Sequence, residues 1–361
     1  MLSLDNVIIK EDLESIFASR SDWKELDNKA VYVTGSTGMI ASYLILFLIY
    51  LNEIKNYNIT ILAGIRNIEK ARGLFGLYLN KNYFKKCTNN ILDSINDDIE
   101  ADYIIHAASL ASPQFYGKMP VETILPNVVA TYRILEYAKL HNINGVLFLS
   151  SGDIYGTLVK EGSIYETDIG ILNHLDVGSF YGESKRCGES LCKAYYLEHG
   201  VPVKFARIAH TYGPTMDWEN DKRVFSEFVK NILNNENIVM KSDGSAKRPF
   251  CYITDNISGL FKILLDGENG EAYNVGNDKE FISIRELAEK LVALFPERVS
   301  QIVCANRNDD SYKPCTELKV AVMSMDKLRA LGWEPIITVE DGFKRTVDAI
   351  IESAQIRNFK S

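Results

Sequence analysis

The sequence lacks several features that would assign it to a specialised class of protein. It has only 6 cysteines in 361 residues, and none forms a C-x-x-C pair. That pattern argues against a disulfide framework or a zinc site and favours free thiols in a reducing cytoplasm. The net charge is −8 and no long lysine or arginine run appears. We therefore expect no metal, no nucleic-acid partner and no anionic membrane surface as partner.

Signals for secretion and membrane insertion are also missing, and the sequence contains no internal repeat. The first residues show no basic segment followed by an apolar core, so we expect no signal peptide. The most apolar segment, Met39 to Leu51, is too short to span a bilayer and is expected to be a buried helix. The composition is 46% hydrophobic and 24% charged, which is typical of a soluble globular protein.

A strand–turn–helix pattern spans Val31 to Ala41, and the rest of the chain is organised around it. An apolar run ends at the turn, where Gly35 can adopt a positive φ and Gly38 lets a pyrophosphate approach the backbone. The following helix presents free N–H groups and a positive dipole end to that anion. The predicted dinucleotide contacts here are Gly35, Thr37, Gly38, Met39 and Ile40.

Strands and helices alternate as far as residue 210, which predicts an α/β fold with a Rossmann-type doubly wound parallel sheet. We expect a helical extension at 1–28 that packs on this domain or forms a subunit contact. Residues 29–210 are expected to bind the dinucleotide, and 211–361 to form mainly a smaller mixed α/β substrate lobe, interleaved with the first domain. The strands expected in the large domain are Ala30–Thr34, Ile59–Ala63, Asp102–Ser109, Gly145–Ser150 and Val201–Ile208. In the lobe we expect helices at Arg223–Leu233, Asn256–Leu265, Ser283–Phe295 and Val339–Ala354, and strands at Ile238–Lys241 and Tyr273–Val275.

The choice between NAD and NADP is open at this level. An NAD site usually has an acidic residue at the end of its second strand, whereas this chain has Arg66 followed by Asn67. Arg66 could meet the 2′-phosphate of NADP, or it could be a solvated residue before a helix that Asn67 caps. Asn90 and Ile91 are a candidate adenine contact or a plain turn.

The apolar stretch before Ser109 ends in small residues, which leave room for a dinucleotide at the carboxyl end of a strand. Ala107, Ala108 and Ser109 are therefore predicted cofactor contacts. His106, at the same strand end, is interpreted as a hydrogen-bonded structural residue rather than a catalyst.

A Tyr-x-x-x-Lys pair places Tyr181 and Lys185 on one face of a helix. A nearby ammonium is expected to lower the pKa of the phenol toward neutrality, and Lys185 can also hold the nicotinamide ribose. Ser151 ends an apolar strand upstream and is placed to hydrogen-bond a substrate hydroxyl beside Tyr181. Together these residues would remove a proton from a sugar hydroxyl while a hydride leaves its carbon.

In this order, the glycine turn, the Ser-containing strand end and the Tyr–Lys pair resemble the extended short-chain dehydrogenase/reductase family, in its nucleotide-sugar epimerase/dehydratase branch. The resemblance runs from Lys29 to about Ile350. Several stretches look most like UDP-glucuronate decarboxylases: His106 to Tyr116 with Pro120, Tyr212 to Pro214, Arg223-Val224, Arg248 to Asp255 and Leu331 to Pro335. The Ala-Ser-Pro-x-x-Tyr-x-x-x-Pro run is the most discriminating of these.

The resemblance also implies roles for individual residues. Ser151 takes the place of the family's catalytic Thr and Asp153 that of its Glu, while Tyr181 and Lys185 match the family pair. Arg248 would hold the diphosphate rather than form a surface ion pair. Tyr116 would face the sugar or simply pack, and Arg223 is a further predicted substrate contact.

Two departures bear on the reaction. Gly152 replaces the acid with which related dehydratases expel water, and His210 replaces a substrate-contacting Asn, either as a new ligand or as a loop residue.

The shared chemistry implied by the resemblance is transient oxidation at C4 of a nucleotide-linked hexose, with the hydride kept on tightly bound NAD or NADP. We predict decarboxylation first, 4-epimerisation second and 4,6-dehydration third. A non-catalytic NADP-sensing protein and a simple reductase are the remaining alternatives.

The family also suggests a homodimer built from two helices per subunit. The apolar positions Leu191, Tyr195 and Tyr196 fit such a face or a core equally well.

Overall fold

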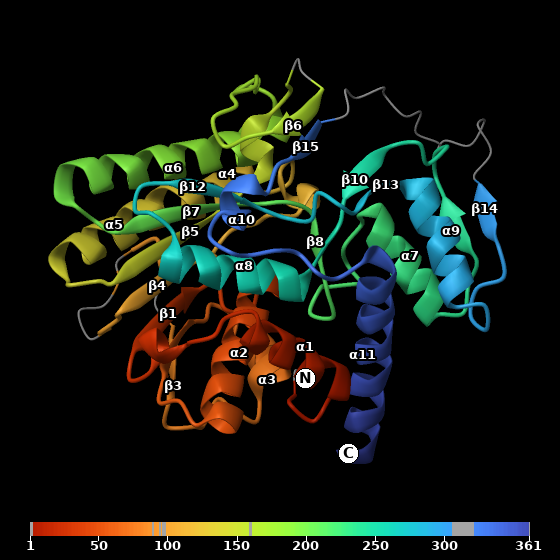
Figure 1. The fold of residues 1–361 in the computed structure, drawn as a ribbon, viewed down its shortest axis with the longest axis horizontal. Coiled ribbons are helices and arrows are strands. Elements are labelled where there is room, and N and C mark those ends of the chain that lie inside the picture. Colours follow the sequence, from red (N-terminus) through yellow and green to blue (C-terminus); the bar gives the residue numbers. More distant parts are fainter. Residues whose placement is uncertain are drawn as a thin grey trace.

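A computed structural model describes residues 3–88, 90–93, 95, 99–158, 161–304 and 321–360, with side chains as far as residue 356. Its centre is a seven-stranded sheet in the order β12-β7-β5-β4-β1-β2-β3, in which every neighbouring pair is parallel (Figure 1). The strands of this sheet are β1 (Ala30–Thr34), β2 (Thr60–Gly64), β3 (Phe84–Cys87), β4 (Tyr103–His106), β5 (Gly145–Ser151), β7 (Val203–Ile208) and β12 (Ala272–Val275). The Rossmann-type fold predicted from the sequence is confirmed.

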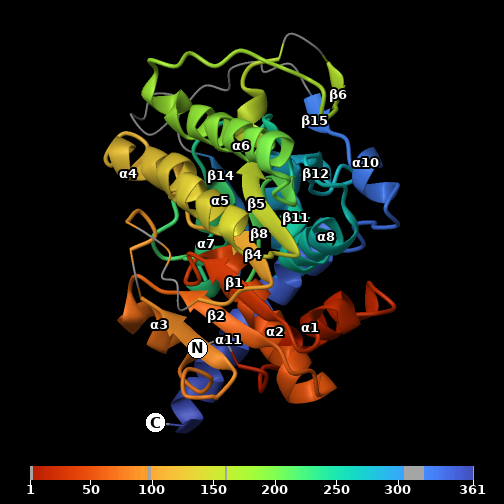
Figure 2. The ribbon, with the colours of Figure 1, turned by 90° about the vertical axis from the view of Figure 1, so that its left-hand side faces the viewer.

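Helices cover both faces of the sheet. Helices α2 and α8 pack on one face and α5 and α6 on the other, where α4 lies beside them (Figure 2). Along β1, Val31 and Val33 belong to the hydrophobic core under α2 and α8, and Tyr32 belongs to the core under α5 and α6, because successive side chains of a strand point to opposite faces. The helices are α1 (Val7–Ala18), α2 (Met39–Lys55), α3 (Ile68–Phe75), α4 (Pro120–Leu125), α5 (Thr131–Leu140), α6 (Phe180–His199), α7 (Val224–Leu233), α8 (Ile253–Asp266), α9 (Ile284–Leu294), α10 (Asp326–Arg329) and α11 (Val339–Lys360).

Short strand pairs build the smaller lobe and the edge of the site. β9 pairs with β14 and β10 with β13 near α7 and α9, while β8 pairs with β11 and β6 with β15. Their bounds are β6 (Gly162–Ile164), β8 (Thr211–Tyr212), β9 (Ile238–Met240), β10 (Lys247–Pro249), β11 (Cys251–Tyr252), β13 (Phe281–Ser283), β14 (Ile302–Cys304) and β15 (Ala321–Met323). Ser283 and Glu286 form a capping box that starts α9.

The structure adds three details to the sequence expectations. Strand β3 was missed because Lys85 and Lys86 are exposed on this edge strand, which hides its apolar pattern. Strand β12 and helix α8, which were listed with the lobe at 211–361, extend and cover the main sheet, as interleaving of that segment with the first domain allows. A π-helical segment, Pro126–Ala130, lies between α4 and α5.

The N-terminal segment is anchored to the rest of the chain through buried groups. Trp23 is 1% exposed and packs edge-on against Phe47 of α2 and Phe261 of α8. Asp12 of α1, also 1% exposed, accepts hydrogen bonds from the hydroxyls of Tyr43 (2.7 Å) and Tyr252 (2.6 Å).

The same carboxylate pairs with Nε of Arg345 on α11, at 2.6 Å. Burial raises the pKa of Asp12, and Arg345 and the two tyrosines oppose that rise. Asp12 therefore joins α1 to α2, β11 and α11.

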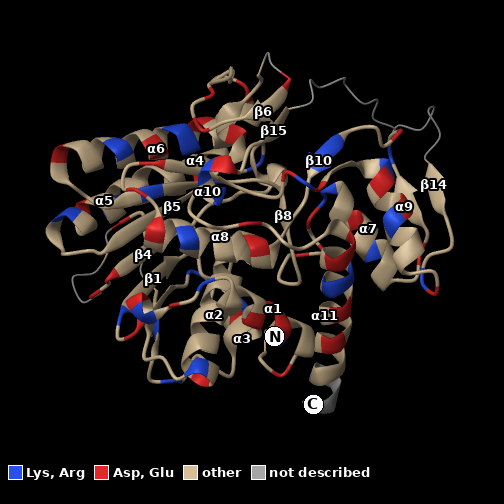
Figure 3. Cartoon of the chain, in the orientation of Figure 1, with Lys and Arg blue, Asp and Glu red and all other residues tan. Residues whose placement is uncertain are grey.

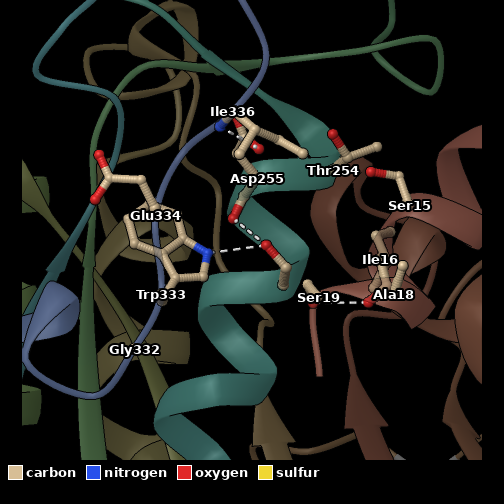
Figure 4. Close-up of a pocket in the computed structure, with 11 residues that line it drawn as sticks. Ser15, Ile16, Ala18, Ser19, Thr254, Asp255, Gly332, Trp333, Glu334 and Ile336 are labelled. Atoms are coloured by element: carbon tan, nitrogen blue, oxygen red, sulfur yellow. Dashed lines mark hydrogen bonds between the residues drawn. The ribbon is translucent and has the colours of Figure 1, made fainter. Parts of the chain in front are cut away.

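A cavity of about 280 Å³ lies between α1, the first turns of α8 and residues 332–336 (Figure 4). At its wall, Asp255 accepts hydrogen bonds from the backbone amides of Ile336 (3.1 Å) and Ile337 (3.0 Å). Trp333 donates to the hydroxyl of Ser258 at 2.9 Å. Burial raises the pKa of Asp255 to about 7 against the effect of the two amides. Two of the stretches that carry the family resemblance, Arg248 to Asp255 and Leu331 to Pro335, both contribute residues to this cavity, and none of the predicted site residues lines it.

Within the described ranges, no helix is both long and apolar enough to cross a bilayer. The same residues contain no group of three or more His, Cys, Asp or Glu side chains placed to hold a metal. Acidic and basic residues are interspersed along the chain in Figure 3, for example along α11.

Replacing Asp12 by Asn tests the anchor. Because the amide keeps only one acceptor oxygen for Arg345 and the two tyrosine hydroxyls, and leaves the guanidinium without its buried counter-charge, we expect the free energy of unfolding to fall by about 3 kcal/mol. The neighbouring Glu11→Gln is the control, since Glu11 pairs with the same guanidinium but is 53% exposed, and we expect a change below about 1 kcal/mol. Urea denaturation measures both values. Equal losses in the two variants would show that the buried carboxylate is not the anchor.

Candidate active site

The turn between β1 and α2 has the geometry of a phosphate-binding loop. Gly35 has a φ of +62°, and a Cβ built on it would lie 2.7 Å from Cα of Ala108, so only glycine fits. Gly38 is the N-cap of α2, and no side chain caps that helix. Thr37, Met39 and Ile40 keep accessible surface around the open N-terminus. This end of α2 can therefore receive a pyrophosphate.

The ends of β1 and β4 are joined by the hydroxyl of Thr34. It accepts hydrogen bonds from the backbone amides of Ala107 and Ala108, both at 3.0 Å, and lies 2.9 Å from Nδ1 of His106. Since the hydroxyl already accepts twice, it donates to Nδ1, and Nε2 of the ring donates to the carbonyl of Pro126 at 3.1 Å. Burial, with a smaller effect of Lys185, lowers the pKa of His106 to about 3. His106 is a neutral structural residue, as its position at the strand end indicated.

Ser109, the next small residue, has a buried hydroxyl with no hydrogen-bond partner among the described residues. This hydroxyl acts on the pKa of Tyr181, so it lies beside the phenol. The hydroxyl of Ser109 thus forms no well-oriented hydrogen bond among the described residues, yet it lies close enough to the phenol to lower its pKa, and such a group fits a polar atom of a bound dinucleotide or substrate.

The adenosine end of the expected cofactor site lies beyond β2. Arg66 is exposed there and forms no ion pair among the described residues. The side chain of Asn67 caps α3 by accepting from the amide of Lys70 at 3.0 Å, which confirms it as the N-cap. Asn90 is exposed and accepts from the amide of Leu92 at 3.2 Å, so it forms a turn, while Ile91 packs partly against the core. Contacts of Arg66, Asn90 and Ile91 with a cofactor stay predictions.

The catalytic candidates meet where α6 begins. Tyr181 is 5% exposed and Lys185 2%. Burial raises the pKa of Tyr181, Asp153 raises it further, and the hydroxyls of Ser151 and Ser109 lower it.

The expected lowering of the Tyr181 pKa by Lys185 was wrong for this structure. The ammonium donates to the carbonyl of Leu149 at 2.6 Å, lies 5.7 Å from the centre of the Tyr181 ring, and has its own pKa lowered to about 7 by burial. Desolvation of the phenol outweighs a cation that is directed elsewhere.

Tyr116 lies against the catalytic phenol. Its ring stacks on that of Tyr181 with centroids 5.2 Å apart and an interplanar angle of 12°. Its hydroxyl donates to the carbonyl of Ala111 at 3.1 Å, so the packing interpretation has direct support. Asp153 and Arg223 both act on the pKa of Tyr116, which places them near the same ring.

Ser151 and Asp153 belong to one turn at the end of β5. The hydroxyl of Ser151 accepts from the amide of Asp153 at 3.1 Å, and a 3₁₀ turn follows from Gly152 to Tyr155. Asp153 has exposed surface, yet the surrounding protein desolvates its carboxyl and raises its pKa. A Cβ built on Gly152 would lie 2.8 Å from Sδ of Met323. The space for a side chain at position 152 is therefore taken by a residue from β15.

Two predicted substrate contacts, Arg248 and Arg223, lie near a third, His210. His210 has exposed surface, yet the surrounding protein desolvates its ring and lowers its pKa to about 4, and the two cations lower it further. Arg223 pairs with Asp221 through Nε and Nη2, the latter at 2.7 Å. Arg248 lies in β10 and donates to the neighbouring carbonyl of Lys247, at 2.7 Å. Among the described residues no carboxylate pairs with Arg248, so the surface ion-pair alternative has no support.

Sequence reasoning missed Thr34 and Met323. A polar residue that ends an otherwise apolar strand was the available signal for Thr34. Nothing in the sequence connects Met323 with Gly152, since only the fold brings them together.

Comparisons with known proteins agree with this geometry. Residues 31–276 match the model of the NAD dependent epimerase/dehydratase family. UDP-glucuronic acid decarboxylase 6 of Arabidopsis thaliana is 30% identical over 315 residues, which cover 87% of each chain.

Two solved structures share the fold. UDP-glucose 4-epimerase of Thermotoga maritima, with UDP-glucose, has a TM-score of 0.74 at 23% identity over 90% of this chain and 99% of that one. UDP-glucuronic acid 4-epimerase of Bacillus cereus, in complex with NAD, has a TM-score of 0.72 at 24% identity over 90% of this chain and 98% of that one. The glycine turn and the Tyr–Lys pair both lie within the matched residues 31–276, and the chain is therefore an enzyme of the NAD-dependent epimerase/dehydratase family.

Proposed function

We propose that the protein decarboxylates a nucleotide-diphosphate uronic acid of the UDP-glucuronate type through a transient 4-keto sugar. The observation that carries the proposal is the turn Ser151-Gly152-Asp153 beside Tyr181. It offers a hydroxyl and a carboxyl next to the phenol but no acid at position 152. The similarity to UDP-glucuronic acid decarboxylases over most of both chains supports the same reaction.

The dinucleotide would lie along the carboxyl edge of the sheet. The turn at Gly35, the open N-terminus of α2 and the small residues Ala107 and Ala108 would hold it, with Lys185 at the nicotinamide ribose. The unpaired hydroxyl of Ser109 fits this placement. When bound, the oxidised nicotinamide supplies a hydride acceptor at C4 and a positive charge close to the phenol.

Tyr181 would take the proton of the C4 hydroxyl as the hydride leaves. Ser151 would hold that hydroxyl, and the hydroxyls of Ser151 and Ser109 favour the phenolate. Stacking on Tyr116 fixes the plane of the phenol. After loss of CO₂, the enolate left at C4–C5 would take one proton at C5 from water. The C4 oxygen would then take back the proton held by Tyr181 when the hydride returns to C4.

Decarboxylation fits the lack of an acid at Gly152. With a carboxylate at C6, the 4-keto sugar is a β-keto acid, and the electrons of the breaking C5–C6 bond flow into the ketone. No leaving group has to be protonated. Expulsion of water would need an acid, and the side chain of Met323 lies where one would extend from position 152.

The nucleotide end would be held by the basic residues near His210. The guanidinium of Arg248 has no carboxylate partner among the described residues and suits a diphosphate, and Arg223 lies close by. His210, kept neutral by the desolvating protein around its ring and by these cations, can donate or accept one hydrogen bond to the substrate. His210 is also the residue that favours the second candidate, 4-epimerisation of another nucleotide sugar, because it departs from the family's Asn.

The same proposal includes a homodimer in a reducing cytoplasm. Leu191, Tyr195 and Tyr196 on α6 are partly buried against the core, and α5 beside them exposes Tyr132. These positions suit a face completed by a second α5–α6 pair.

Mass spectrometry of the product tests the reaction. The protein is incubated with a panel of nucleotide sugars, UDP-glucuronate included, and with NAD or NADP. We expect a product lighter by CO₂. An unchanged mass with a new chromatographic peak would replace decarboxylation by epimerisation, and loss of water would refute the argument from Gly152.

Tyr181→Phe tests the assigned base. Since only the hydroxyl is removed and the stack on Tyr116 is kept, we expect kcat to fall by about 10²- to 10⁴-fold while the cofactor stays bound. Tyr83→Phe, which removes a hydroxyl bonded to Glu53 at the far edge of the sheet, should leave kcat unchanged. Substantial activity in Tyr181→Phe would remove the phenol from the mechanism and favour a different base.

Arg66→Ala tests the dinucleotide. Because the end of β2 carries a free guanidinium and no carboxylate, we expect the protein to bind NADP as well as NAD. The variant should weaken NADP binding by about tenfold and leave NAD within about twofold. Arg72→Ala in α3, where Arg72 pairs with Glu69, is the control. If NADP binding does not change, Arg66 is a solvated residue before the helix.

A further inference from the structure

A buried polar network lies behind the catalytic turn. Arg207 of β7 and Glu189 of α6 have side chains only 12% exposed and form a double ion pair, with Nε–Oε1 at 3.1 Å and Nη2–Oε2 at 2.8 Å. The remaining guanidinium nitrogen donates to the hydroxyl of Tyr155 at 3.0 Å and to the carbonyl of Glu166 at 2.7 Å. All three nitrogens of Arg207 are therefore used.

The network continues through Tyr155, which is 2% exposed. Its hydroxyl donates to Oδ1 of Asn274 on β12 at 2.6 Å. The side-chain nitrogen of Asn274 donates to the carbonyls of Ile164 and Ser324, both at 3.1 Å, at the end of the pairing of β6 with β15. One chain of hydrogen bonds thus connects α6, β7, the catalytic turn and β12.

Two members of this network, Tyr155 and Glu189, lie close to the catalytic candidates along the sequence. Tyr155 closes the 3₁₀ turn that begins at Gly152 and includes Asp153. Glu189 lies one helical turn after Lys185 on α6, on the same face. Arg207 contacts both and so sets how the turn lies relative to the helix.

The contact between helix and turn leaves little tolerance. A Cβ built on Gly182 of α6 would lie 2.8 Å from the carbonyl oxygen of Asp153. Arg186, also on α6, donates to the carbonyl of Ile154 at 2.7 Å. The close contact at Gly182 fixes the distance between α6 and the turn. The hydrogen bonds of Arg186 and Arg207 to the turn resist its movement along the helix.

We propose that Glu189, Arg207 and Tyr155 are positioning residues that hold Ser151 and Asp153 in register with Tyr181 and Lys185. This inference rests on the proposed reaction, in which these two pairs act on the same sugar. None of the three residues is assigned a contact with substrate or cofactor.

Two variants cut the network without a large loss of volume. Tyr155→Phe removes one hydroxyl and keeps the ring, and Glu189→Gln removes the charge and keeps the shape. Asp278→Asn is the matched control, because Asp278 forms a similar double pair with Arg329 outside the site, with side chains 20% and 25% exposed.

The readouts are kcat, KM for the nucleotide sugar that the wild type converts, and hydrogen exchange of the peptide covering residues 149–158. A misplaced turn slows the chemical steps more than it weakens binding. We therefore expect kcat to fall by about tenfold or more in both variants with KM within about threefold, and exchange of that peptide to become faster. Asp278→Asn should change neither.

A rise in KM with unchanged kcat, or a kcat that falls only with the folded fraction, would overturn the inference. If the wild type converts no sugar in the panel, the proposed reaction is refuted independently of this inference. Hydrogen exchange alone then tests the positioning role. Unchanged exchange in residues 149–158 of both variants would overturn the positioning role, and faster exchange there would support it.

Discussion

The contact between the backbones at Gly35 and Ala108 is the constraint on which the site depends. A Cβ at Gly35 would lie 2.7 Å from Cα of Ala108, so the glycine turn and the end of β4 meet without any side chain between them. The hydroxyl of Thr34 holds the same two segments by accepting from Ala107 and Ala108. The dinucleotide would therefore run across one rigid surface from the N-terminus of α2 toward Tyr181 on α6.

Buried charged groups join segments that are distant in the sequence. Asp12 connects α1 with α11, Asp255 holds the backbone at Ile336 and Ile337, and Arg207 connects α6 with the catalytic turn. Each carboxylate has several donors, as the cost of burying a charge requires. Because β12 and α8 return to the main sheet from the later part of the chain, these segments lie close enough to form the contacts.

The parts that the sequence predicted well depend on local patterns. β1 and its glycine turn, the cap at Asn67 and the helix that carries Tyr181 and Lys185 each follow from neighbouring residues. β3 could not be found in this way, since its exposed lysines conceal an edge strand. The pKa of Tyr181 was predicted in the wrong direction because spacing along a helix gives no measure of burial. The approach of Met323 to Gly152 and the contacts of Arg207 depend on tertiary structure alone.

The proposed reaction requires that C4 of the sugar is oxidised and reduced again within one binding event. A substrate carrying deuterium at C4 tests it most directly, with the position of the label read by mass spectrometry and NMR. If C4 is oxidised and reduced in this way, the product keeps deuterium at C4 and no reduced dinucleotide accumulates in solution. Loss of the deuterium, or its release into free reduced cofactor in proportion to product, would refute this cycle and indicate a dehydrogenase that exchanges its cofactor at every turnover.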